Sequence, residues 1–282
     1  MQSAHGQLPP ATTPPTPRQA GEETRWPPWP LSFAPIGFLV AVGFSTALIA
    51  PLAAAFGGGD TDDLPASLVL AGTLVQDAIF VATAILLAAT IAKPRAWHFG
   101  LSRTRLWPAV GATVVAALSF YVFVGVYSAL VDPTGEQTVA KDLGADRGGL
   151  ALVAAGILIV VVAPVAEEFF FRGFFYRALR SRLGIMAAAA VDGSLFGAIH
   201  YSGAETLSLL PMLAVLGLVF CLLYERTGSL FPGIAMHAAN NGVAYASTTD
   251  NAVALSIALA AIALAGSLLI PAYLRDRPEA VV

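Results

Sequence analysis

Long apolar stretches alternate with short polar connections along most of the chain. A helix needs roughly 20 mostly apolar residues to cross a hydrocarbon core of about 30 Å, and Gly, Pro or charged residues in the connections favour helix ends. The pattern predicts eight membrane-spanning helices, at about residues 31–56, 67–92, 107–131, 149–176, 185–203, 206–225, 229–247 and 252–273.

The fifth and seventh of these segments carry polar side chains that a lipid-facing helix does not tolerate. Their presence implies an interior that the other helices shield from lipid. The predicted fold is an all-α, polytopic membrane helical bundle of about eight helices, forming one transmembrane domain over residues 31–282.

Residues 1–30 differ from the rest of the chain. They hold eight of the 19 prolines, together with Thr, Gln, Gly and Ser, and they lack the continuous apolar core of a signal peptide. This composition predicts a disordered, proline-rich N-terminal tail.

Composition and charge agree with the bilayer as solvent. The chain is 57% hydrophobic and 12% charged, with a mean hydropathy of +0.73, which leaves too little polar surface for a soluble globule. The net charge is −3 and the basic residues form no nucleic-acid-like patch. The lipid bilayer is therefore the expected partner, and nucleic acid is not.

The positions of Lys and Arg predict the orientation. With the N-terminus in the cytoplasm, 13 of the 15 basic residues fall on the cytoplasmic side, and only Lys141 and Arg147 fall outside. By the positive-inside rule, this distribution predicts an integral protein of the cell membrane with both termini in the cytoplasm.

The fourth apolar segment runs into two adjacent carboxylates, Glu167 and Glu168. A charge at membrane depth costs at least about 2.5 kcal/mol. The two carboxylates must therefore be shielded from lipid, protonated, paired with a cation or retained for a function. Glu168 is spaced to pair with Arg172 one helical turn on, whereas Glu167 lies on another face without a local cation. One interpretation is an ion-pair cluster that only fixes helix packing. For Glu167 we favour a general base, because an unpartnered carboxylate in an apolar site has a raised proton affinity.

Two histidines lie within apolar segments. Phe196 and His200 are four residues apart, as are His237 and Asn241, so each pair can project from one helix face towards a common centre. A lone histidine on an apolar helix is more often a hydrogen-bonded core residue. Two of them, with Glu167 and an asparagine in one shielded bundle, favour a site.

Three other polar or reactive residues in apolar segments have simpler interpretations. Asp192 could orient His200, but we favour a role in packing or in supporting the site. Asp77 is interpreted in a similar way, as a polar contact between helices. Cys221 is the single cysteine, which excludes an internal disulfide.

The three motifs, taken in order, resemble those of the CAAX-processing and bacteriocin-processing (CPBP, or Abi) family of intramembrane proteases, which includes the type II CAAX prenyl endopeptidases. The resemblance covers about residues 120–250, and no motif position departs from the pattern. The motifs are Glu167-Glu168-x-x-x-Arg172, Phe196-x-x-x-His200 and His237-x-x-x-Asn241.

The resemblance implies an intramembrane endopeptidase that cuts membrane-associated or lipidated peptides or proteins. Glu167 and His200 would activate the attacking water, and His237 with Asn241 would stabilise the oxyanion. Glu168, Arg172 and Phe196 would support the site.

The same residues permit a metal-dependent mechanism. Glu167, His200 and His237 could be three ligands of a catalytic zinc, with a fourth position for water. Because the sequence has no HExxH helix, in which ligand spacing itself signals zinc, we prefer a mechanism without metal or other cofactor.

Two other functions are compatible with the polar residues. A proton-coupled transporter could use them as a relay, although the two halves show no convincing repeat. A catalytically silent immunity or scaffold protein could keep the motifs for binding alone. The motifs describe the chemistry of the water and the oxyanion, so they leave open whether a substrate is prenylated.

Overall fold

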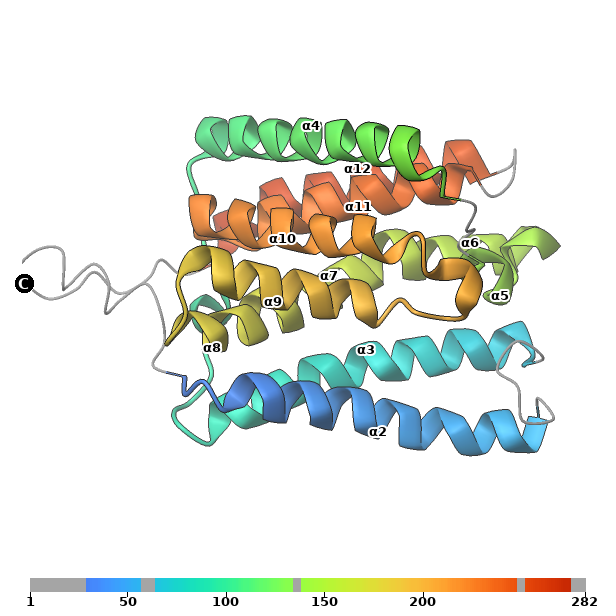
Figure 1. Ribbon diagram of the computed structural model, residues 1–282, viewed down its shortest axis with the longest axis horizontal. Helices are drawn as coiled ribbons and strands as arrows, with labels where there is room; N and C mark the ends of the chain where they lie inside the picture. Colours follow the sequence, from blue (N-terminus) through green and yellow to red (C-terminus); the bar gives the residue numbers. More distant parts are fainter. Residues whose placement is uncertain (1–28, 57–63, 134–137, 248–251, 275–282) are drawn as a thin grey trace, which may run out of the picture.

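The computed structural model describes residues 29–56, 64–133, 138–247 and 252–274. Within these ranges the secondary structure is helical and contains no strand (Figure 1). Residues 1–28 of the predicted tail lie outside the described residues. Trp29, next to the predicted boundary at residue 31, is 3% exposed, and its ring packs 5.2 Å from Phe99 and 5.4 Å from Phe174.

Each of the eight predicted segments contains a helix or helical rod. One rod is continuous from Gly149 to Arg180 and consists of α6 (Gly149–Ile157), η3 (Leu158–Val162), α7 (Ala163–Phe170), η4 (Phe171–Phe175) and α8 (Tyr176–Arg180). The other seven are α2 (Phe33–Phe56), α3 (Ala66–Ala89), α4 (Leu106–Val131), α9 (Ile185–Ala198), α10 (Leu210–Thr227), α11 (Phe231–Ala246) and α12 (Ala252–Tyr273). Short helices in the connections are η1 (Ala96–Phe99), α5 (Val139–Asp142), η2 (Ala145–Arg147) and η5 (Ala204–Thr206).

Six of these helical segments are long and apolar enough to cross a membrane, namely α2, α3, α4, the rod, α10 and α12. The prediction of eight spans is therefore only approximate. The two exceptions are α9, with 14 residues, and α11, with 16 residues. At 1.5 Å per residue they reach only about 21–24 Å, less than a hydrocarbon core of about 30 Å. The protein is an integral membrane protein in which these two polar helices depend on their neighbours.

The helices lie roughly along one direction, and the rod runs through the middle of the bundle (Figure 1). It contacts α3 on one side and α11 and α12 on the other, while α9 packs closely on α10. Every residue from Phe170 to Leu179 is buried. The rod is thus the central helix of the bundle, and the candidate site lies where the other helices pack against it.

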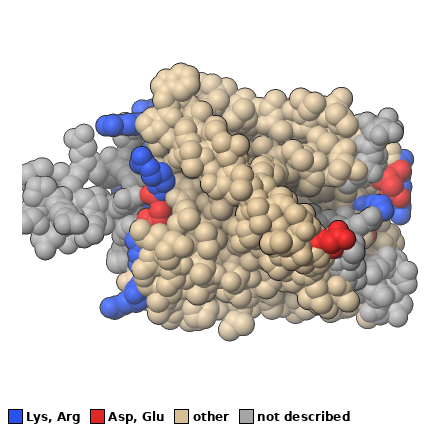
Figure 2. Space-filling view, turned by 45° about the horizontal axis from the view of Figure 1, so that its top comes forward, with Lys and Arg blue, Asp and Glu red and all other residues tan. Residues whose placement is uncertain are grey.

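The outer surface of the bundle is apolar. Large side chains such as Leu39, Leu118 and Leu130 are 70%, 62% and 80% exposed. On the face seen in Figure 2, charged side chains lie near the two ends, with an uncharged band between them. An apolar belt with charged ends is typical of a surface that faces lipid.

Two π-helical turns, η3 and η4, interrupt the rod on either side of α7. Such turns frequently occur at functional sites. At η3 the cause is in the sequence: Pro164 has no N–H, and the Ala163 N–H bonds to Leu158 O in the wider π pattern. Helix α7 is therefore a short segment with its own register inside a continuous rod.

Candidate active site

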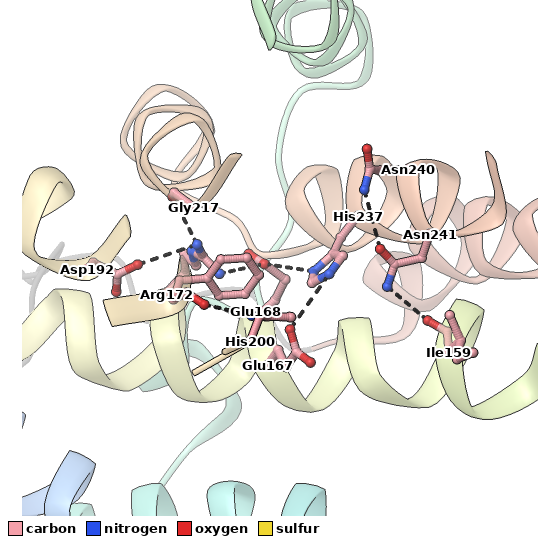
Figure 3. A network of polar contacts seen from close by, with 11 residues as sticks. Ile159, Glu167, Glu168, Arg172, Asp192, His200, Gly217, His237, Asn240 and Asn241 are labelled. Carbon is pink, nitrogen blue, oxygen red and sulfur yellow. Dashed lines mark hydrogen bonds and ion pairs between the residues drawn. The ribbon is translucent and has the colours of Figure 1, made fainter. Parts of the chain in front are cut away.

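Glu168 joins α7 to two other elements. Its side chain is 1% exposed, and one oxygen, Oε1, accepts hydrogen bonds from Arg172 Nη1 at 2.9 Å and from His237 Nδ1 at 3.2 Å (Figure 3). The ion pair that the spacing of Glu168 and Arg172 predicts is present. The bond to His237, from α11, connects that pair to the second histidine motif.

Arg172 lies in the core of the bundle. It is one of the 13 basic residues that the charge pattern assigns to the cytoplasmic side, yet it is fully buried. Nη2 donates to Gly217 O at 2.9 Å and lies 3.4 Å from Asp192 Oδ1. The guanidinium also lies 4.5 Å from the ring centre of Phe196. Arg172 therefore ties α9 and α10 to the rod.

The close approach of α9 and α10 beside Arg172 depends on glycines that sequence reasoning did not single out. A Cβ added to Gly217 would lie 2.8 Å from Gly193 Cα, and one added to Gly193 would lie 2.5 Å from Ala214 O. Gly193 and Gly197 form a G-x-x-x-G pattern, the usual sequence signal for close packing of membrane helices. This signal could have predicted the contact.

His237 lies between the two glutamates. Its side chain is 3% exposed, with Nδ1 3.2 Å from Glu168 Oε1 and Nε2 3.7 Å from Glu167 Oε2. Since the carboxylate of Glu168 only accepts, Nδ1 carries a hydrogen and Nε2 is the nitrogen that faces Glu167. The imidazole stacks on Phe220 at 4.9 Å, which helps to hold the ring in this orientation.

Glu167 points into the same region with an oxygen that is not satisfied. Its side chain is 15% exposed, and among the described residues Oε2 is buried without a hydrogen-bond partner. At 3.7 Å, His237 Nε2 is beyond ordinary hydrogen-bond length. Such a carboxylate can accept a proton from a small molecule placed beside it.

His200 is half-buried in the turn that follows α9, rather than within the helix, and it is held by the end of that helix. Nδ1 lies 2.7 Å from Phe196 O, and the imidazole packs 5.0 Å from the Phe196 ring. Because a carbonyl oxygen only accepts, Nδ1 carries the hydrogen and Nε2 of the neutral ring keeps its lone pair. The Phe196 ring also lies 5.7 Å from His237, so this aromatic ring contacts both imidazoles. The direct contact of Glu167, however, is with His237.

Asn241 lies farther along α11, against η3 (Figure 3). Its Nδ2 donates to Ile159 O at 3.0 Å, and its Oδ1 accepts from Asn240 Nδ2 at 3.4 Å. In a π pattern the partner of Ile159 O would be the nitrogen of Pro164, which has no hydrogen. The Asn241 amide therefore satisfies a carbonyl that the proline leaves open, and its second N–H is available to another acceptor.

The structure does not assemble the alternative zinc ligands. Across the described residues, no three His, Cys, Asp or Glu side chains form a group that could hold a metal ion. Glu167, His200 and His237 are therefore not brought together as a set of metal ligands in the part of the chain that the structure describes.

The fold and site together define a membrane-embedded helical bundle with a buried carboxylate and imidazole cluster. Residues 149–243, which run from α6 into α11, match the family model described as "Type II CAAX prenyl endopeptidase Rce1-like". The matched segment contains every motif residue. The resemblance that the motifs indicate is therefore confirmed, and at the level of the family this segment is similar to CAAX-type intramembrane proteases.

A curated relative agrees over a segment of similar length. The "Uncharacterized protein YyaK" of Bacillus subtilis (strain 168) is 32% identical over 95 residues, which are 32% of this chain and 32% of the relative. The chain thus spans about a third of the length of the curated relative that it matches. No solved structure matches the chain.

Proposed function

We propose that the chain is an intramembrane endopeptidase that hydrolyses peptide bonds of membrane-associated or lipidated peptides or proteins. One observation carries the proposal. The buried, unsatisfied oxygen of Glu167 faces Nε2 of a histidine whose other nitrogen is fixed by Glu168. The similarity of this segment to Rce1-like proteins supports the reaction class.

In the first step Glu167 acts as general base. It takes a proton from the water molecule that attacks the scissile carbonyl, and this transfer contributes on the order of 10²–10⁴-fold to the rate. His200 accepts from the same water through Nε2, since its Nδ1 hydrogen is directed to Phe196 O. Glu167 then returns the proton to the leaving amine, so that the site is restored.

Two donors stabilise the oxyanion in this mechanism. In this mechanism His237 carries both ring hydrogens: Nδ1–H donates to the Glu168 carboxylate, and Nε2–H donates to the developing negative charge. The second N–H of Asn241 is the other donor. Each donor in a dry site contributes about 3 kcal/mol. Arg172 holds the Glu168 carboxylate in place.

The position of Glu167 in the rod suits a substrate held in the bilayer. Glu167 precedes Arg180 by about 20 Å along the rod, at 1.5 Å per residue. With both termini in the cytoplasm and the protein in the cell membrane, as the distribution of Lys and Arg favours, we expect the scissile bond to lie near the middle of a hydrocarbon core of about 30 Å.

The experiment compares the proteomes of membranes that express the parent chain or Glu167→Gln. Glu225→Gln is the matched control, because Glu225 is a carboxylate of α10 that pairs with Arg180 at 2.5 Å, away from the site. We expect uncut membrane peptides to accumulate only in Glu167→Gln. Metal content is measured on the same purified samples.

Three results would contradict the proposal. Identical cleavage products in the parent and Glu167→Gln would remove Glu167 from the chemistry. Full biological activity of Glu167→Gln, or proton-coupled flux in liposomes without any peptide cleavage, would support a scaffold or a transporter instead.

A further inference from the structure

A second carboxylate, Asp77, is buried in the membrane on α3. It is 5% exposed, and among the described residues its Oδ2 has no hydrogen-bond partner. Asp77 is the only charged residue in the 24 residues of α3. A carboxylate in the middle of an apolar helix is costly in lipid, so its presence points to a role beyond packing.

The packing of α3 on α7 places Asp77 opposite Glu167. Both helices run in the same direction, from right to left in Figure 1. The ring of Phe80 lies 4.7 Å from that of Phe170, which fixes the register of the two helices. Asp77 precedes Phe80 by three residues, and Glu167 precedes Phe170 by three. The two carboxylates therefore lie at one level of the interface between α3 and α7.

The elements that α3 contacts most offer no positive charge to Asp77. These elements are α2, α7 and η3. Helix α2 and turn η3 contain no titratable side chain, and α7 contributes only Glu167 and Glu168. Glu168 is already paired with Arg172. Two neighbouring carboxylates in a medium of low dielectric do not both ionise, so the pair is expected to hold one proton.

We propose that Asp77 is a positioning residue for Glu167, whose protonated carboxyl donates a hydrogen bond to the Glu167 carboxylate. This inference rests on the proposed function, because it assigns the base of that reaction a second carboxyl group. The bond keeps Glu167 ionised and turned towards the water. When Glu167 takes the proton of the water, both carboxyls are neutral. When Glu167 protonates the leaving amine, the original state returns, and Asp77 keeps its proton throughout.

The test compares two substitutions of Asp77 with a control on the same helix. Asp77→Asn keeps a neutral N–H donor, whereas Asp77→Leu removes the donor at similar volume. Thr83→Val is the control, because Thr83 is also buried on α3, at 6% exposed. We expect Asp77→Leu to lower kcat on the order of 10- to 100-fold with little change in KM. Asp77→Asn and Thr83→Val should stay close to the parent.

An infrared measurement tests the shared proton without using activity. The parent, purified and folded, should show the C=O stretching band of a protonated carboxylic acid that is absent from Asp77→Asn. This variant retains a donor, so it also guards against a fold that fails in Asp77→Leu. The band should persist in Thr83→Val.

The inference is wrong if an active parent and both Asp77 variants have the same kcat, or if Asp77→Asn loses as much activity as Asp77→Leu. An unchanged infrared band in Asp77→Asn would also contradict it. A parent that cleaves no membrane peptide would refute the proposed function instead, and the infrared band would still decide whether the carboxyl pair exists.

Discussion

Replacing Arg172 by Met removes the central cation of the bundle while keeping a long apolar side chain. Arg172 is fully buried and bonds to Glu168 Oε1, to Gly217 O and, at 3.4 Å, to Asp192. In the variant, Glu168 and Asp192 stay buried without the arginine, and Gly217 O loses the hydrogen bond that the guanidinium donates. We therefore expect Arg172→Met to destabilise the protein strongly.

The magnitude follows from the kind of contact that is lost. Removing one partner of a buried ion pair costs about 3–5 kcal/mol, because the other charge stays buried and uncompensated. For a protein of this size each kcal/mol lowers Tm by about 2–4 °C, so the expected fall is on the order of 10 °C. Arg172→Lys should lie between the parent and Arg172→Met, since a lysine keeps the charge but not the forked geometry.

The assay is thermal unfolding of the purified protein in one detergent, with Arg182→Met as control. Arg182 is exposed at the end of the rod, where a substitution should change stability by less than about 0.5 kcal/mol. Adding Glu168→Gln to Arg172→Met should recover part of the loss, because one stranded charge is then neutralised. Equal Tm values for Arg172→Met and Arg182→Met would refute the account of the buried network.

Three further predictions concern neighbouring features. Glu168→Gln should lower kcat on the order of 10- to 100-fold, measured with a membrane peptide, because a neutral amide holds the His237 imidazole less firmly through Nδ1; an unchanged kcat would contradict the pairing. Gly217→Ala should cost about 1–3 kcal/mol in thermal unfolding, since its Cβ would lie 2.8 Å from a backbone atom of α9, whereas Gly125→Ala, with nothing within 4 Å, should not. Burial, and then two nearby arginines, lower the pKa of His98 in η1 below its usual 6.5. The unfolded chain therefore binds the extra proton first, so Tm should fall as pH drops below about 6.5, and less so in His98→Gln; identical pH curves would exclude this cause.

The sequence predicts the helices well because lipid leaves the backbone few alternatives. Backbone groups in the hydrocarbon must be satisfied within helices, so apolar stretches such as 33–56 and 106–131 read directly as spans. The two segments that carry polar side chains are the exceptions, because they do not read as simple spans. In the structure they contain the short helices α9 and α11. The burial of Trp29 could not be predicted, because the residues around it are rich in proline and show no apolar pattern.

Contacts within one helix were also predictable, whereas most side-chain contacts between helices were not. The Glu168 and Arg172 pair follows from a spacing of four residues. The bond from His237 to Glu168 spans 69 residues and depends on how α11 packs against α7. Likewise, the sequence suggested for Asp77 only a polar contact between helices. The contact of Phe80 with Phe170 sets the register of α3 on α7 that puts Asp77 at the level of Glu167. Helix–helix registers of this kind come from packing and leave no periodic signal in one sequence.

Turnover of one membrane peptide in liposomes, in water enriched in heavy oxygen, tests the central claim most directly. The peptide is one that accumulates uncut with Glu167→Gln. The account predicts that the parent and Glu225→Gln cleave it and place one heavy oxygen in the new carboxyl terminus, and that Glu167→Gln is slower by at least about 10²-fold. Cleavage by Glu167→Gln at the rate of the parent, with the same labelled product, would contradict the account.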